Sequence, residues 1–166
     1  MFVLKPLSRE AIPGALAKAE RYRLLNEPWQ AESICRDILA IEAGHREARV
    51  MLVLALTDQF AQGIAVHEVL EELAGLGDEY DRRYYTGIVH ERRALALFRQ
   101  TDFRSGDPVY MLMEHAMDWY ERAQELRPSG NDDSLLRWNA CARFLKRYPQ
   151  LRPAPQEREL QPVSSE

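Results

Sequence analysis

Residues 116–128 have the sequence AMDWYERAQELRP, and their pattern gives the clearest indication of the fold. Ala116, Tyr120 and Ala123 recur at helical spacing in the order small, aromatic, small, and Pro128 closes the segment. Upstream apolar residues extend the same helical face: Val109, Leu112 and Met113. This pattern predicts a helix that buries one face against another helix.

Small residues recur outward from this stretch with a fixed period. Ala31 and Ala65 are 34 residues apart, and Ala19 and Gly87 are 68 apart, which is twice that period. A period of this length indicates stacked helix–turn–helix units.

Proline and glycine divide the chain into blocks of helix length. Pro28 and Pro108 suit the first position of a helix, where an N–H would have no partner, and Ser8 and Asp133 are expected N-caps. The run VMLVLAL, residues 50–56, could be a buried strand, but no other segment alternates in a way that would pair with it, so a buried helix is favoured. We therefore expect an all-α chain whose helices cover about residues 8–26, 28–43, 50–56, 64–74, 79–100, 108–126 and 133–148.

The period and the small residues resemble the tetratricopeptide repeat family over about residues 12–129. The best match is Ala116, Tyr120, Ala123 and Pro128. The first hairpin has Tyr22 and the series Ala31, Cys35, Ile38, with Ala43 where the family has proline. The second keeps Ala65 and Val69 but places Glu72 and Gly77 at the next two positions of the pattern. In the third, Gly87 and Ala116 are 29 residues apart where the family has 12, an insertion of 17.

The resemblance implies a right-handed array of about three antiparallel helical hairpins, and residues 133–148 resemble the helix that caps such arrays. In this family the first helices line a concave face. One subgroup binds a chaperone carboxylate there with lysine, asparagine and arginine. The matching positions here supply no such group, so that clamp is not expected: Leu16, Glu20, Met51, Asp81 and Tyr85.

Length and composition bound the class of protein. The 166 residues fit one helical domain at residues 1–148, and the proline-rich residues 149–166 are expected to be disordered or extended. A net charge of −4 argues against nucleic acid as the partner. The N-terminus lacks a secretory signal and no apolar run could span a bilayer, so no membrane partner and a cytoplasmic location are expected. Cys35 and Cys141 fall on apolar helix faces and are expected to be reduced and buried.

No motif predicts catalysis, a cofactor or a bound metal. The pairs His67-Glu68 and His90-Glu91 resemble the start of the zinc-protease helix motif. The second histidine of that motif is missing, because Glu71 and Ala94 stand in its place. We therefore expect a protein that is not an enzyme.

The charged residues of the fifth helix suggest two interpretations. In the first, Arg82, Arg83 and His90 form a basic-aromatic groove with Tyr85 or its neighbour Tyr84 and bind an acidic peptide. In the second, this is a solvated face with local ion pairs such as Glu79 with Arg83.

The sixth helix adds further candidates for a binding surface. Tyr110, Met117 and Trp119 lie off its apolar face and would mark a partner site if they are exposed. The expected partner-binding residues are therefore Arg82, Arg83, Tyr85, His90, Tyr110 and Trp119.

The function expected from these features is that of a non-catalytic scaffold or adaptor, which binds a partner protein or peptide on its concave surface. Two alternatives remain open. The array could be a homodimer held by the long helix and loop at about residues 95–109, or it could hold a small ligand in a pocket near His90.

Overall fold

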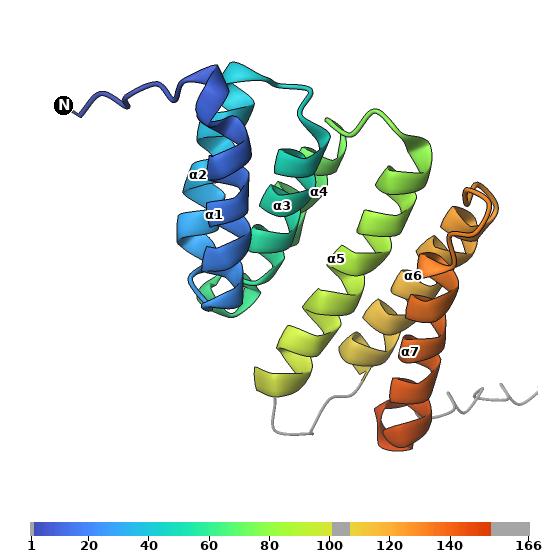
Figure 1. The fold of residues 1–166 in the computed structure, drawn as a ribbon. Coiled ribbons are helices and arrows are strands. Elements are labelled where there is room, and N and C mark those ends of the chain that lie inside the picture. The colour runs from blue at the N-terminus through green and yellow to red at the C-terminus, as the bar shows by residue number, and fades with distance from the viewer. Residues whose placement is uncertain (1, 101–106, 154–166) are drawn as a thin grey trace, which may run out of the picture.

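The computed structural model describes residues 2–100 and 107–153, and this part of the chain is helical without a strand. Seven α-helices succeed one another along the chain (Figure 1). Their bounds are α1 Ile12–Leu24, α2 Pro28–Ile41, α3 Arg46–Thr57, α4 Val66–Leu73, α5 Glu79–Gln100, α6 Asp107–Gln124 and α7 Asp133–Arg147. The expected all-α class is confirmed.

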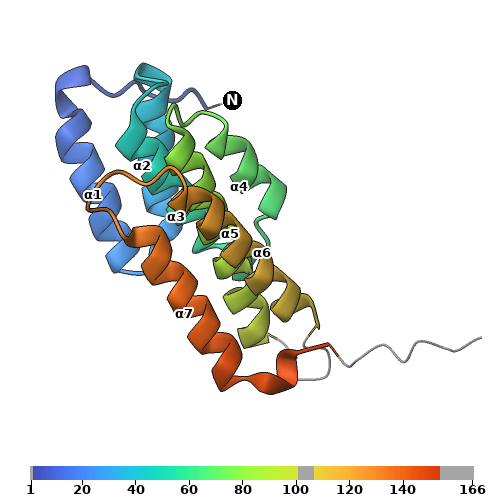
Figure 2. The ribbon, with the colours of Figure 1, turned by 90° about the vertical axis from the view of Figure 1, so that its right-hand side faces the viewer.

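Each helix packs on the next one in the chain, and α5 with α6 is the most extensive of these contacts. Contacts also join α1 to α3 and α3 to α5. The α1, α3 and α5 helices therefore lie in a row (Figure 1), and Figure 2 shows the same helices from another side. The α7 helix packs on α6 at the far end of the row.

Of the apolar face expected at residues 109–123, Leu112 is half-buried and the other members are buried. Ala116, Tyr120 and Ala123 are fully buried, and so is Gly87, which faces Tyr120 from α5. A Cβ atom at Gly87 would lie 2.5 Å from Cε1 of Tyr120, so only glycine permits this approach of α5 to α6. The run 50–56 is helical, and its buried members include Leu52 and Leu56.

Several boundaries differ from the sequence expectations. Ser8 precedes a short 3-10 helix, Arg9–Ala11, and forms no side-chain cap. Asp133 is the first residue of α7 and not its cap; Oδ1 of Asn131 accepts a hydrogen bond from its N–H at 2.9 Å. The tail that was expected to be disordered or extended begins with a 3-10 helix, Pro149–Leu151, whose Leu151 is buried against α6 and α7. The rest of that expectation concerns mostly residues 154–166, which lie outside the described residues.

Both cysteines are free and buried, as expected. Burial raises the pKa of Cys35 and of Cys141 to about 12. Such thiols are unreactive near neutral pH. In the described part of the chain, no helix combines the length and the apolar character needed to cross a membrane.

Candidate partner-binding groove

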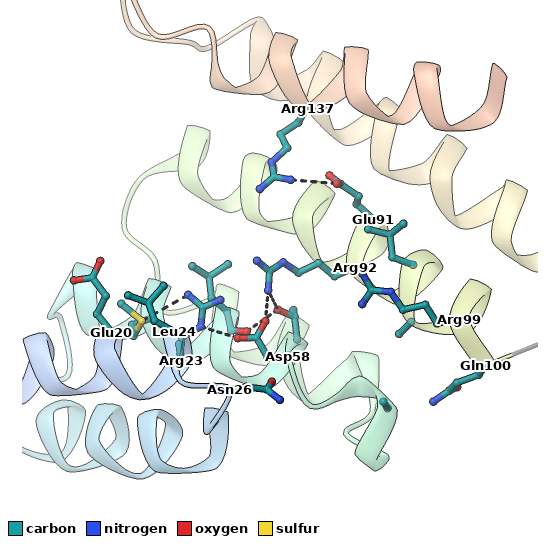
Figure 3. Close-up of a pocket in the computed structure, with 16 residues that line it drawn as sticks. Glu20, Arg23, Leu24, Asn26, Asp58, Glu91, Arg92, Arg99, Gln100 and Arg137 are labelled. Carbon is teal, nitrogen blue, oxygen red and sulfur yellow. Dashed lines mark hydrogen bonds and ion pairs between the residues drawn. The ribbon is translucent and has the colours of Figure 1, made fainter. Parts of the chain in front are cut away.

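A groove of about 660 Å³ opens between α1, α3, α5 and α7, and we call it the central groove (Figure 3). Its walls come from helices that are far apart in the sequence but adjacent in the fold. The lining residues are Glu20, Arg23, Leu24, Asn26, Met51, Leu54, Thr57, Asp58, Ala61, Glu91, Arg92, Leu95, Ala96, Arg99, Gln100 and Arg137.

The α5 helix supplies one long wall of this groove. Arg92, Leu95 and Arg99 are spaced by three and four residues, so they share one face of the helix. Arg92 and Arg99 are seven residues apart, which separates them by about 10 Å along the axis. The helix therefore presents two cations with an apolar residue between them.

Asp58 connects two guanidinium groups across the groove. Its Oδ2 atom accepts a hydrogen bond from Nε of Arg23 at 2.7 Å, and its Oδ1 atom accepts one from Nη1 of Arg92 at 2.5 Å. Thr57 Oγ1 accepts a further bond from Arg92 at 3.1 Å. Burial lowers the pKa of Arg92, but an arginine remains charged at neutral pH. The Asp58 carboxylate thus connects α1, α3 and α5 at the floor of the central groove.

A second carboxylate, Glu91, is buried and positions Arg137. Glu91 is 6% exposed, and its Oε2 atom accepts a hydrogen bond from the Tyr120 hydroxyl at 2.6 Å. Its Oε1 atom accepts one from Nη1 of Arg137 at 3.2 Å. Burial and the Glu91 charge both raise the pKa of Tyr120, so the hydroxyl stays protonated and donates. The network connects α5 with both α6 and α7, and holds the Arg137 guanidinium at the groove wall (Figure 3).

The groove carries more positive than negative charge, in a chain whose net charge is −4. Four arginines line it against three carboxylates, Glu20, Asp58 and Glu91. Arg99 is exposed and forms no ion pair with a described residue, so its charge is open to a ligand. Leu24, which is 83% exposed, adds apolar surface at the rim. Cations beside apolar side chains suit a ligand that is both acidic and apolar.

Arg82 and Arg83, expected to bind a partner, instead form local ion pairs. Arg82 contacts Glu79 at 2.6 Å and donates to the Leu76 carbonyl. Arg83 contacts Glu79 at 2.9 Å and donates to the Arg122 carbonyl of α6 at 2.9 Å. The alternative interpretation, which named the pair Glu79 with Arg83, describes this geometry.

The other expected site residues are spread over the fold and do not line the central groove. Tyr85 packs between two core clusters, and burial raises its pKa to about 12. His90 lies beside His115 of α6, with ring centroids 5.8 Å apart. Tyr110 is half-buried and packs against the core, and Trp119 is half-buried beneath the Arg122 guanidinium at 4.8 Å. The structure therefore does not bring the six residues into one surface.

Sequence reasoning missed the arginines that converge: Arg23, Arg92, Arg99 and Arg137. One signal was available, because Glu20 and Met51 were placed on the concave face and both line the central groove. Arg23 lies one helical turn after Glu20, so it shares that face. Applying the same facing rule to α5 would have favoured Arg92 and Arg99 over Arg82 and Arg83.

The two alternative sites can also be placed. The small-ligand pocket was expected near His90, which does not line the central groove. The alternative dimer contact at residues 95–109 includes residues 101–106, which lie outside the described residues. Of its described ends, Leu95 lines the central groove and Val109 is buried.

The described residues also contain no group of three or more His, Cys, Asp or Glu that could hold a metal ion. Comparison with known proteins identifies no relative. No family model, no curated protein and no solved structure matches the chain.

Proposed function

We propose that this chain is a non-catalytic interaction module that binds an acidic, partly apolar segment of a partner protein in the central groove. The helices would form a right-handed array of three hairpins, α1–α2, α3–α4 and α5–α6, with α7 as the capping helix. The resemblance to tetratricopeptide repeats supports this arrangement, and so do the side-by-side contacts of α1, α3 and α5.

The observation that carries the proposal is the convergence of four guanidinium groups from three helices on one groove. Arg23 comes from α1, Arg92 and Arg99 from α5, and Arg137 from α7. A segment with carboxylates near Arg99 and Arg137 and an apolar residue against Leu95 would match both the charge and the surface of the groove. An extended peptide advances about 3.3 Å per residue, so about three residues would span the distance from Arg92 to Arg99.

A binding role also agrees with the state of the groove carboxylates. Asp58 already accepts hydrogen bonds from two arginines, and Glu91 accepts them from Arg137 and Tyr120. Both carboxylates therefore hold arginines of the groove in place, where they supply charge and shape to a ligand.

The test measures peptide binding by fluorescence anisotropy. Two labelled probe peptides share the same leucines, and their remaining positions are glutamate in one and lysine in the other. We expect the glutamate peptide to bind and the lysine peptide not to bind, and we expect the affinity to fall with added salt.

The variant Arg99→Glu should weaken binding of the glutamate peptide by about tenfold or more. Arg99 is the best position to change because it is exposed and its loss leaves no described carboxylate without its cation. Arg143→Glu is the matched control, because it makes the same charge change at an exposed position of α7 that does not line the groove. Equal binding of both peptides, or an equal loss in the two variants, would refute the proposal.

A further inference from the structure

An exposed apolar arm precedes the first hairpin. Phe2, Val3 and Leu4 are 104%, 85% and 86% exposed, and Lys5 follows them. The arm has no regular secondary structure and leaves the top of α1 away from the rest of the molecule (Figure 1). Three consecutive apolar side chains in solvent form a surface that burial in a partner would stabilise.

A second groove, of about 410 Å³, lies on the outer face of the first hairpin, and we call it the end groove. It runs along α1 and reaches α2. Its lining residues are Leu7, Glu10, Ala11, Gly14, Ala15, Lys18, Ile34 and Asp37. At the opposite end of the row of helices, α7 packs on α6 and buries Cys141 and Leu145. The first hairpin has no corresponding helix on its outer face among the described residues.

We propose that the arm of one copy of this chain binds in the end groove of a second copy, and that the exchange is reciprocal. The apolar side chains of Phe2 and Leu4 would cover Ala15 and Ile34. Lys5 would then lie beside the groove carboxylates Glu10 and Asp37, which outnumber its one cation, Lys18. The arm therefore matches the groove in apolar character and in charge.

A second copy is the occupant that the structure favours. A single chain leaves both the arm and the end groove uncovered, so each copy carries one half of the contact and lacks the other. Two identical copies related by a two-fold axis supply both halves at once.

The test is the mass in solution, measured by light scattering after size exclusion and by sedimentation across a range of concentrations. The chain has a mass of 19.3 kDa, and we expect twice that value at the upper concentrations. The variant Phe2→Ser/Leu4→Ser removes the apolar arm and should weaken the dimer by about 100-fold or more.

A second variant blocks the groove from the other side. A Cβ atom at Gly14 would have nothing within 4 Å, so Gly14→Leu fits the folded chain and fills the end groove. It also replaces a residue that disfavours helices, so a loss of the dimer would not reflect unfolding. Met111→Ser/Leu126→Ser is the control, since it removes exposed apolar side chains that line neither the end groove nor the central groove and should leave the dimer intact.

Charge exchange gives an independent check. Lys5→Glu should weaken the dimer, and Asp37→Lys in the same chain should restore part of the lost affinity.

A chain that stays monomeric at every concentration would overturn the proposal, including the case in which the arm folds into its own groove. A dimer that survives both the arm variant and Gly14→Leu would also overturn it. The proposal does not depend on peptide binding in the central groove, because none of the variants named for this test changes a residue near Arg99 or Arg137.

Discussion

The α5–α6 pair and the α1–α2 hairpin are both pairs of adjacent helices, but they use their side chains differently. In α5–α6, the fully buried Tyr120 packs against Gly87 and donates a hydrogen bond to the buried carboxylate of Glu91. In α1–α2, Gly14 faces open space and Trp29 remains 58% exposed. The first pair is completed by contacts within the chain, whereas the hairpin leaves apolar side chains exposed.

Adding one methyl group to each helix pair should change the free energy of unfolding in opposite directions. In Gly87→Ala the new Cβ atom would lie 2.5 Å from Cε1 and 2.7 Å from Cδ1 of Tyr120. The ring is fully buried and cannot move aside without disturbing its neighbours. We expect the free energy of unfolding, measured by urea denaturation, to fall by about 2–3 kcal/mol.

Gly14→Ala is the matched variant in α1. Nothing lies within 4 Å of the added Cβ atom, and alanine favours helix more than glycine does. We expect the free energy of unfolding to rise by about 0.5–1 kcal/mol. If the two alanine variants had equal stability, the close approach of α5 to α6 would not be the tight contact described above.

Removing one hydroxyl group tests the same difference between the α5–α6 pair and the α1–α2 hairpin, with a smaller expected effect. Tyr120→Phe deletes the 2.6 Å hydrogen bond to Glu91 and leaves that buried carboxylate with Arg137 and the Cys141 thiol as partners. Hydrogen bonds to charged groups contribute about 1.5–3 kcal/mol, and we expect a loss of about 2 kcal/mol in the thermal or urea unfolding of the variant.

Tyr22→Phe provides the control in α1. Tyr22 is half-buried, and its hydroxyl forms no hydrogen bond with a described residue. Its removal should change the free energy of unfolding by less than about 0.5 kcal/mol. Equal losses in the two phenylalanine variants would mean that the Glu91 network adds nothing beyond the packing of the ring.

The sequence predicted the helices well because their signals are local. The spacing of Ala116, Tyr120 and Ala123 marked a buried face, and all three are fully buried. Proline placement set the start of α2 at Pro28, and the bounds of α5 are those expected. The caps were predicted less well. Ser8 precedes a short 3-10 helix and forms no side-chain cap, and Asp133 is the first residue of α7 and not its cap.

The central groove could not be predicted from the sequence in the same way, because it depends on which faces of the helices come together in the fold. The charged residues of α5 are spread around the helix, so their density alone favoured Arg82 and Arg83. Both are held by Glu79 and by backbone carbonyls. Arg137 lies beyond residues 12–129, where the small-residue period was found, and joins the groove because α7 packs on α6 and brings it to Glu91.

The smallest expected effect concerns the outer side of the α5–α6 pair, where two histidines meet. The Nδ1 atom of His90 is buried without a hydrogen-bond partner in the described structure, and the ring lies 5.8 Å from that of His115. Burial, and then the charge of His115, lower the pKa of His90 below its ordinary value of 6.5. The unfolded chain therefore takes up this proton at a higher pH than the folded chain does.

The sign of the pH effect follows from that difference. Where the unfolded state binds more protons, stability falls as the pH falls, so the contribution of His90 is complete above about pH 6.5 and is lost toward its folded pKa. We expect the urea midpoint of the native chain to fall between pH 7 and pH 5 by more than that of His90→Gln. The difference should be smaller than the effect of Tyr120→Phe.

His67→Gln is the control because His67 is exposed on α4 and makes no contact of this kind. This variant separates the buried position of His90 from the loss of a histidine as such. If the stability of His90→Gln kept the full pH dependence, burial of His90 between α5 and α6 would not be the cause of that dependence. The difference between the α5–α6 pair and the α1–α2 hairpin would then be limited to the contacts of Gly87, Glu91 and Tyr120.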